Sequence, residues 1–347
     1  MNKLRKILKP LSVLYGEVTN LRNKAYDKNI IQVTAFDFPV ISVGNLSTGG
    51  TGKTPQVEYL IRLLQKDYRV AVLSRGYKRK SKGFIIAGKD ATAEQIGDEP
   101  MQYFLKFPEI MVAVDANRIN GIDQLRAQEP KPDVIILDDA FQHRSVKAGL
   151  NILLTTFDKP YSKDEVLPSG DLREKRSGAK RAEVIVLTKC PEHLSEKDQF
   201  EKAKELNPEL YQTVFFSAIT YDRDVLSEKD TININDLKDY KVLLVTGIAK
   251  TDPLVNFLIS KGCAIKHLRF SDHHQFSNND IKRISDEFSD LNEKRKIILT
   301  TEKDYVRTPE FSGLNVYYLP IQTKFISNQI DFDKIVLKYV RENTGNS

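Results

Sequence analysis

The chain has 347 residues, 40% hydrophobic and 29% charged, a composition typical of a soluble globular protein of about two domains. The formal net charge of +6 favours an anionic partner without identifying it. Cys190 and Cys263, the only cysteines, favour a reducing compartment over a disulfide scaffold, and no apolar run approaches the roughly 18 residues of a membrane-spanning helix.

Residues 1–28 predict an amphipathic helix with a basic start. Its apolar residues recur every three or four positions: Leu4, Ile7, Leu8, Leu11, Leu14, Tyr15, Val18 and Leu21. The basic residues near its start are Lys3, Arg5, Lys6 and Lys9. Two interpretations stay open, because the apolar face can pack on the domain or lie in a bilayer interface with the cations at anionic headgroups.

Apolar runs alternate with helical patterns along most of the chain. The runs in the first part are Val40–Val43, Val70–Leu73, Ile110–Ala113, Val134–Leu137, Ile152–Leu154 and Val184–Leu187. Continuous apolar strands of this kind are typical of a parallel sheet with helices on both faces. We therefore predict an α/β fold with a mostly parallel, P-loop NTPase-like sheet over residues 1–220. A second alternating block predicts a smaller α/β lobe over residues 221–347.

The first apolar run leads directly into the sequence NLSTGGTGKTP, residues 45–55, which resembles a phosphate-binding loop. Counting back from Gly52-Lys53-Thr54 places Ser47 where the P-loop pattern has its first glycine. A strand, a glycine-rich turn and the start of a helix point backbone N–H groups at phosphates. The residues predicted to bind the nucleotide are Ser47, Thr48, Gly49, Gly50, Thr51, Gly52, Lys53 and Thr54. Lys53 is expected at the β- and γ-phosphates, and the Thr54 hydroxyl at Mg²⁺.

The run Val134–Leu137 ends in two carboxylates, Asp138 and Asp139. Carboxylates at the carboxyl end of a strand beside a P-loop are suited to hold Mg²⁺ directly or through water. Together with Thr54 they form the predicted metal site. Polar residues follow at once in Gln142-His143-Arg144.

Seven motifs together resemble the tetraacyldisaccharide 4′-kinase family, the lipid A 4′-kinases of Gram-negative bacteria. They are GGTGKTP at 49–55, SRGY at 74–77, GDEP at 97–100, DDAFQHR at 138–144, PSGDLRE at 168–174, FSDHHQF at 270–276 and TTEKDYVR at 300–307. Serine or threonine is usual in that family at the first position of the loop, which is Ser47 here. The chain departs from it at Asp171, where proline is common.

The resemblance implies ATP- and Mg²⁺-dependent phosphorylation of the 4′-hydroxyl of an acylated glucosamine disaccharide 1-phosphate, giving lipid IVA. It implies Asp98 as the catalytic base and a histidine of the second lobe as its partner, with His273 favoured over His274. The residues alone favour another role for Asp98, at the start of the helix that Pro100 opens. With a lipid as substrate, the basic helix favours peripheral contact of the protein with the cytoplasmic face of the inner membrane. We expect no nucleic-acid partner and no obligate protein partner.

A transferring phosphoryl group and an anionic substrate both suit guanidinium groups. The candidate substrate contacts near the motifs are Arg75, Gln142, His143, Arg144 and Arg173, with Arg118 beside them. Thr188-Lys189 and residues 300–304 follow strands and are candidates for the nucleotide base or ribose. The rival hypothesis is a P-loop switch ATPase or GTPase acting on a protein partner, which needs neither Asp98 nor the histidines. A structural membrane-associated scaffold, the third hypothesis, leaves the P-loop unexplained.

Overall fold

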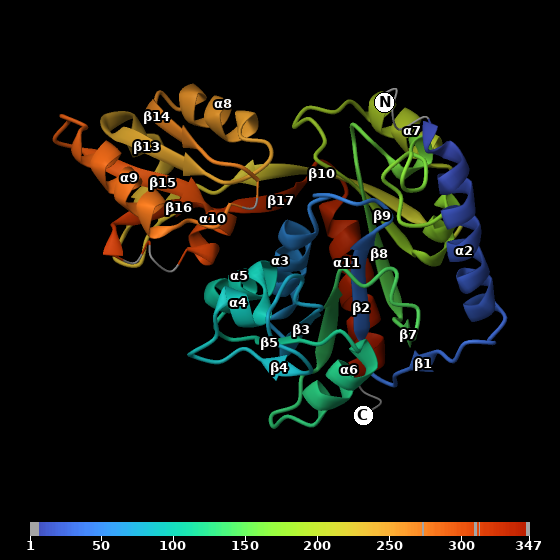
Figure 1. Cartoon of the computed structure of the whole chain (residues 1–347). Coiled ribbons are helices and arrows are strands. Elements are labelled where there is room, and N and C mark those ends of the chain that lie inside the picture. The colour runs from blue at the N-terminus through green and yellow to red at the C-terminus, as the bar shows by residue number, and fades with distance from the viewer. Residues whose placement is uncertain (1–6, 273, 309–310, 312, 345–347) are drawn as a thin grey trace.

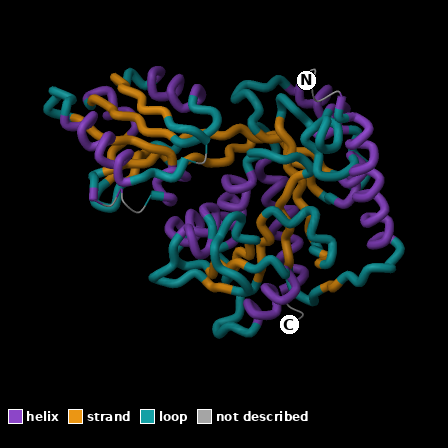
Figure 2. Tube along the Cα trace, in the orientation of Figure 1, coloured by secondary structure: helices purple, strands orange, loops and turns teal. Residues whose placement is uncertain are grey.

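The computed structural model describes residues 7–272, 274–308, 311 and 313–344, which form two lobes (Figure 1). Strands β10 (Thr213–Tyr221) and β17 (Ile321–Phe325) pair antiparallel. Figure 2 shows this pair as the stretch of sheet that runs from one lobe to the other. The chain therefore enters the second lobe after β10 and returns from it along β17.

A nine-stranded sheet in the order β17-β10-β9-β8-β2-β6-β3-β5-β4 forms the first lobe. All neighbours pair parallel except at the two ends, where β17 and β4 are antiparallel to β10 and β5. Its other strands are β2 (Val40–Asn45), β3 (Val70–Ser74), β4 (Ile85–Ile86), β5 (Met111–Val114), β6 (Val134–Asp138), β8 (Leu150–Thr156) and β9 (Val184–Thr188). Each apolar run predicted as a strand lies in this sheet, so the predicted mostly parallel α/β fold is confirmed.

Helices cover both faces of this sheet because successive strand side chains point to opposite sides. Along β6, Ile136 is buried in one core with helices α3, α5 and α11, whereas Ile135 and Leu137 are buried in another core with α6. These helices are α3 (Lys53–Leu64), α5 (Asp98–Lys106), α6 (Arg118–Arg126) and α11 (Gln329–Thr344).

The C-terminal end of the chain packs in the first lobe. Phe325 of β17 and Phe332 and Val336 of α11 are buried in the same core as α3. The expected second lobe, residues 221–347, therefore differs from the observed one, which lies between β10 and β17. An apolar strand pattern shows that a segment is buried in a sheet but does not show which sheet, and this accounts for the difference.

The second lobe has a six-stranded sheet in the order β12-β11-β16-β15-β13-β14. Strands β14, β13, β15 and β16 pair parallel, and β11 and β12 complete the sheet in antiparallel pairing. The strands are β11 (Asp224–Leu226), β12 (Thr231–Asn233), β13 (Lys241–Thr246), β14 (Ala264–Arg269), β15 (Lys296–Thr301) and β16 (Val316–Leu319). The helices are α8 (Asp252–Ser260), α9 (Asn278–Ser289) and α10 (Glu302–Arg307).

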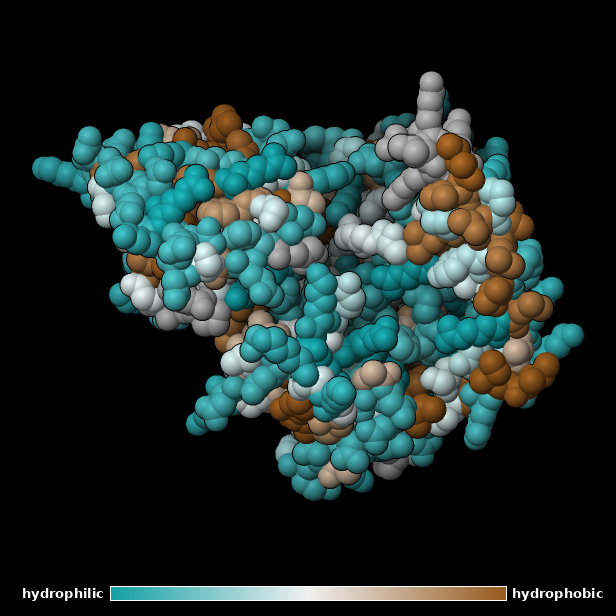
Figure 3. All heavy atoms as spheres, in the orientation of Figure 1, coloured by the Kyte–Doolittle hydropathy of each residue, from teal (hydrophilic) through white to brown (hydrophobic). Residues whose placement is uncertain are grey.

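Helix α2 (Lys9–Asp27) lies on the outside of the first lobe with its apolar residues turned to solvent (Figure 3). Side chains between 55% and 64% exposed are Leu11, Val13, Leu14, Val18 and Leu21. The small residues Ser12 and Gly16 are buried instead. The apolar stripe is therefore not the face that packs on the domain.

Residues 1–6, with the predicted basic start of the helix, lie outside the described residues. Within the described part of the chain, no helix has both the length and the apolar character needed to cross a bilayer.

Candidate active site

The loop between β2 and α3 has the backbone of a phosphate cradle. Gly49 and Gly52 adopt φ angles of 111° and 84°, a region in which other side chains are strained. A Cβ added to Gly49 would meet no atom within 4 Å, so this part of the loop is open. Ser47 is not among the residues with positive φ, and it forms an antiparallel bridge with Leu172. An extended residue does not need the freedom of glycine, which explains why serine fits the first position of this loop.

Side chains from the end of β9 brace the cradle. The Thr188 hydroxyl donates to the carbonyl of Thr51 at 2.7 Å, and Lys189 Nζ donates to the carbonyl of Gly50 at 2.6 Å. Burial, followed by the charge of Lys250, lowers the pKa of Lys189. The structure thus places Thr188 and Lys189 against the phosphate loop, a contact that their position after a strand did not predict.

Asp138 ends β6 next to the P-loop strand and is 6% exposed. Its Oδ2 accepts a hydrogen bond from the Ser74 hydroxyl at 2.5 Å. Its Oδ1 is buried and has no hydrogen-bond partner within the described part of the chain. Burial, with repulsion from Asp139, raises the pKa of Asp138 from 3.8 to about 6. An unpartnered buried carboxylate oxygen beside a P-loop is suited to a cation ligand.

Asp139 has the opposite electrostatic environment. Burial alone would raise its pKa, but the charges of Lys53 and Arg173 outweigh burial and lower it. Its Oδ1 lies 3.5 Å from Lys53 Nζ and 3.1 Å from Arg173 Nη1. The two adjacent carboxylates therefore differ, since Asp139 holds the P-loop lysine while Asp138 keeps one oxygen unpaired.

This difference predicts opposite effects on stability. The folded-state pKa of Asp138 lies above its ordinary value, so its favourable contribution is full below pH 3.8 and lost as the pH rises through about 6. Asp138→Asn removes the buried charge and keeps an acceptor for Ser74. At pH 8 we expect it to stabilise the fold by about 1–3 kcal/mol and raise Tm by a few degrees, with a smaller gain as the pH falls toward 4.

Thermal unfolding in buffer with a metal chelator measures this effect. Asp139→Asn is the matched control and should lower Tm at pH 8, because it leaves Lys53 and Arg173 without their carboxylate. A lower Tm for Asp138→Asn at pH 8 would contradict the assignment of Asp138 as a buried charge kept for a ligand.

The loop with the PSGDLRE motif is tied to the P-loop strand through Gln142. Gln142 Nε2 donates to the carbonyl of Asn45 at 2.8 Å, and its Oε1 accepts from Arg173 Nη1 at 3.3 Å. The carbonyl of Asp171 accepts from the Thr48 N–H at 2.7 Å. The Asp171 N–H donates to Asp164 at 3.3 Å, a bond that proline could not form.

Arg118 is 1% exposed and lies under the carboxylates. It donates to the carbonyl of Asp115 and, at 3.3 Å, to the carbonyl of Asp138. Burial lowers the pKa of Arg118 to about 10, so it stays charged at neutral pH. Burial and the charges of Arg118 and Arg75 lower the pKa of His143 to about 4, which keeps the imidazole neutral.

Arg144, predicted near the substrate, is engaged by helix α2. Its Nη1 donates to the carbonyl of Asn23 at 2.7 Å, and its Nη2 donates to Asp27 at 2.6 Å. Its guanidinium also lies 5.1 Å from the ring centroid of Tyr26. In this structure Arg144 fastens α2 to the first lobe.

Asp98 is the first residue of α5 and follows Gly97, which has a φ of 98° and ends α4 (Ala93–Ile96). The turn lies close to the SRGY loop, since a Cβ on Gly97 would come within 3.2 Å of Gly76 Cα. That loop begins after Ser74, the residue bound to Asp138. The helix start predicted from the sequence is therefore observed, and it places Asp98 beside the loop that contacts the carboxylate site.

Only one of the two histidines considered as the partner of Asp98 is among the residues that the structure describes. His273 lies outside the described residues. His274 Nε2 is 3.1 Å from Asp280 Oδ2 at the start of α9, so this ring is held by the helix cap and not by Asp98. Asp98 Oδ2 instead accepts a hydrogen bond at 2.7 Å from Arg307 Nε of the second lobe. Position 307 lies in the quoted TTEKDYVR motif, but nothing in the spacing predicted this contact.

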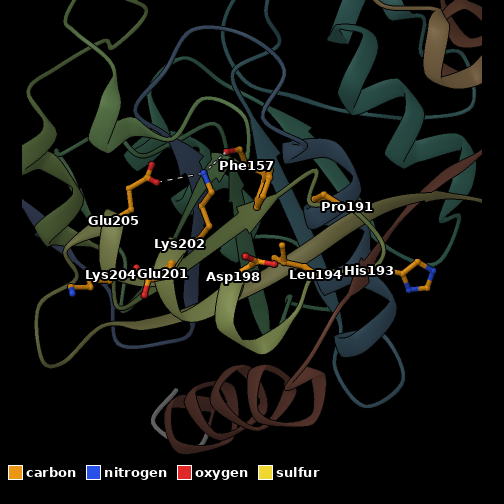
Figure 4. A pocket seen from close by; sticks show the side chains of 9 residues that line it. All are labelled: Phe157, Pro191, His193, Leu194, Asp198, Glu201, Lys202, Lys204 and Glu205. Atoms are coloured by element: carbon orange, nitrogen blue, oxygen red, sulfur yellow. Dashed lines mark hydrogen bonds and ion pairs between the residues drawn. The ribbon is translucent and has the colours of Figure 1, made fainter.

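A pocket of about 590 Å³ opens between the loop after β9 and helix α7 (Glu196–Leu206), as Figure 4 shows. Its wall includes Phe157, Pro191 and Lys202, but none of the P-loop residues or paired carboxylates. A second hollow of about 400 Å³ is lined by Arg75, Lys78 and Lys82 of the loop after β3. In the larger pocket Lys202 and Lys204 lie with Asp198, Glu201 and Glu205, whereas the residues that line the second hollow include cations and no carboxylate. The P-loop and the second hollow are therefore the candidate active site.

Comparisons with known proteins find relatives that match nearly the whole chain. Residues 4–341 match the family described as tetraacyldisaccharide-1-P 4′-kinase. The chain is 52% identical to the tetraacyldisaccharide 4′-kinase of Flavobacterium johnsoniae over 99% of both chains. It is 40% identical to that of Porphyromonas gingivalis over 94% of both chains. Among solved structures it resembles "apo" form LpxK from Aquifex aeolicus in complex with ATP, with a TM-score of 0.78 and 32% identity over 97% of this chain and 99% of that one.

Proposed function

The chain belongs to the tetraacyldisaccharide 4′-kinase family, and from this premise we propose which of its residues carry out the phosphoryl transfer. The reaction moves the γ-phosphoryl group of ATP to the 4′-hydroxyl of an acylated glucosamine disaccharide 1-phosphate, a step of lipid A biosynthesis. The switch ATPase or GTPase hypothesis is not favoured, because the family match covers nearly the whole chain, including the second lobe.

The nucleotide phosphates would lie in the cradle of residues 47–54. The open backbone at Gly49 and the charge of Lys53, 3.5 Å from Asp139, support this placement. Mg²⁺, when bound, would neutralise charge on the β- and γ-phosphates. The Thr54 hydroxyl and Asp138 are the residues that would hold it. The observation that carries this assignment is the buried, unpartnered Oδ1 of Asp138.

The transfer forms a bond between the sugar 4′-oxygen and the γ-phosphorus and breaks the bond from that phosphorus to the β–γ bridging oxygen of ADP. The hydroxyl proton passes to a carboxylate, for which we propose Asp98. The Asp98 side chain pairs with Arg307, is 27% exposed and lies beside the SRGY loop. The basic hollow lined by Arg75, Lys78 and Lys82 suits an anionic part of the acceptor.

Contact with a membrane is proposed from the outward face of α2. Arg144 and the Ser169 N–H, which donates to Ser12 at 2.8 Å, fix the polar face of α2 on the first lobe. Leu14, Val18 and Leu21 are left exposed as a row on the other face. An apolar helix face of this kind can lie in the bilayer interface, where the acyl chains of the acceptor are held. We place this contact at the cytoplasmic face of the inner membrane, where ATP is available.

One assay tests the reaction and the membrane contact together. Acceptor lipid in anionic vesicles is mixed with the enzyme, Mg²⁺ and γ-labelled ATP, and label is counted in lipid and in free phosphate. We expect the label in lipid. Label that accumulates only as free phosphate would favour the switch ATPase.

In the same assay, replacing Leu14, Val18 and Leu21 together by serine should raise KM for vesicle lipid several-fold and leave KM for ATP unchanged. Exposed apolar residues away from α2, Ile259 and Ile330, supply the matched control when replaced by serine. Equal KM values for lipid in the two variants would remove α2 from membrane binding. We prefer these substitutions to deletion of α2, because they keep the polar contacts that hold the helix on the first lobe.

A further inference from the structure

Helix α10 of the second lobe meets helix α5 of the first through charged side chains. The ion pairs between them are Asp98–Arg307 at 2.7 Å, Glu99–Lys303 at 3.3 Å and Lys106–Glu302 at 2.7 Å. Helix α5 also reaches the P-loop helix, since Gln102 Nε2 donates to Glu58 at 2.7 Å. The helix that begins with Asp98 is therefore held between the P-loop helix and the second lobe.

Arg307 is itself fixed by the second lobe. Its Nη1 lies 3.4 Å from Oδ1 of Asp304, a fully buried residue. Oδ2 of Asp304 accepts from the Gly247 N–H at 2.9 Å and from the Thr301 hydroxyl at 2.8 Å. A hydrogen-bonded chain thus runs from the ends of β13 and β15 through Asp304 to the guanidinium.

The loop of the histidine motif lies at the same place. A Cβ on Gly247 would come within 3.1 Å of Asp304 Oδ1 and 3.3 Å of His274 Cβ, so both side chains lie close against this glycine. The second lobe therefore brings Arg307 and the loop of the histidine motif to one junction with α5.

The hydrogen bond from Arg307 to Asp98 uses only one of the two carboxylate oxygens. Arg307 Nε bonds to Oδ2, while Oδ1 accepts no hydrogen bond from any residue that the structure describes. The Arg307 side chain is 8% exposed and the Asp98 side chain 27% exposed, so the cation is inside the junction and the carboxylate faces outward. One oxygen is held and the other is free to meet an incoming hydroxyl.

We propose that Arg307 is a positioning residue for the transfer, and that it orients the Asp98 carboxylate from the second lobe through Oδ2 while Oδ1 receives the proton of the acceptor hydroxyl. This rests on the proposed role of Asp98 as the base. Because Arg307 is carried by the second lobe, a shift of that lobe relative to the first displaces the base.

The test replaces Arg307 and separates kcat from KM. Arg307→Ala and Arg307→Gln should lower kcat by about tenfold to a hundredfold, the cost of a misplaced catalytic group, and change KM for ATP by less than about twofold. Arg307→Lys keeps a cation at the junction and should recover part of the lost kcat. The matched control is Lys106→Gln, which removes the cation from an ion pair of the same interface that does not touch Asp98, and its kcat should stay within about twofold of wild type.

The outcomes distinguish this proposal from the proposed function. If Asp98→Ala is inactive while folded Arg307→Gln and Arg307→Ala keep wild-type kcat, Asp98 is still the base and the positioning role is overturned. If Asp98→Ala keeps wild-type kcat, the base assignment itself fails. Loss of kcat in Lys106→Gln as large as in Arg307→Gln would also overturn the positioning role, because the interface alone would then explain the effect. Melting curves of all variants establish that folded proteins are compared, and Arg307→Lys supplies the comparison if both uncharged variants unfold.

Discussion

Lys53→Ala should lower kcat for phosphoryl transfer by about 10²–10³-fold while the protein stays folded. Lys53 begins α3 at the end of the glycine-rich loop, and its ammonium group lies 3.5 Å from Asp139 Oδ1. In that position the Lys53 ammonium group can neutralise the negative charge that develops on the γ-phosphoryl group during transfer. Alanine removes this charge without disturbing the backbone of the cradle, which depends on Gly49 and Gly52.

The measurement is the steady-state rate of label transfer from ATP to the lipid acceptor, with a melting curve for each protein. Lys66→Ala, which removes an exposed lysine just beyond the same helix, is the matched control and should be as active as wild type. A folded Lys53→Ala protein with a rate within about threefold of wild type would contradict the assignment of the P-loop.

The sequence predicted the features that depend on local patterns. Each apolar run became a strand of the parallel sheet, because burial on both faces requires continuous apolar residues. The glycine-rich loop and the carboxylates of Asp138 and Asp139 followed from their place at the ends of two strands, which the register shows to be neighbours. The glycine-rich motif and the strand pattern together were therefore sufficient to predict the nucleotide and metal half of the candidate site.

Other features depend on contacts between distant segments, which spacing does not encode. The period of α2 showed an apolar stripe but not which face packs, and the structure buries Ser12 and Gly16 instead of the leucines. The pairing of β17 with β10 returns the C-terminus to the first lobe. Arg307 and Asp98 are 209 positions apart in the chain, and only the fold of the second lobe brings them together.

Asp98→Ala should lower kcat by about 10²–10⁴-fold, the range of general acid–base catalysis, with a much smaller effect on ATP binding. The carboxylate starts α5, is held through Oδ2 by Arg307, and, among the residues that the structure describes, shares no hydrogen bond or ion pair with the phosphate cradle. Loss of this carboxylate should therefore raise the free energy of the transition state for transfer and affect ATP binding much less. Asp90→Ala, at an exposed position ahead of the same pair of helices, is the matched control.

In the proposed reaction, the P-loop delivers the γ-phosphoryl group to a lipid hydroxyl whose proton passes to Asp98. It is tested most directly by the single-turnover rate of label transfer from ATP to the disaccharide acceptor, with enzyme in excess and the reaction quenched at successive times. We expect the wild-type enzyme to label the 4′-position of the lipid, and Asp98→Ala to bind ATP normally but to transfer at least about a hundredfold more slowly. Transfer by folded Asp98→Ala at the wild-type rate, or label released as free phosphate by the wild-type enzyme, would contradict it.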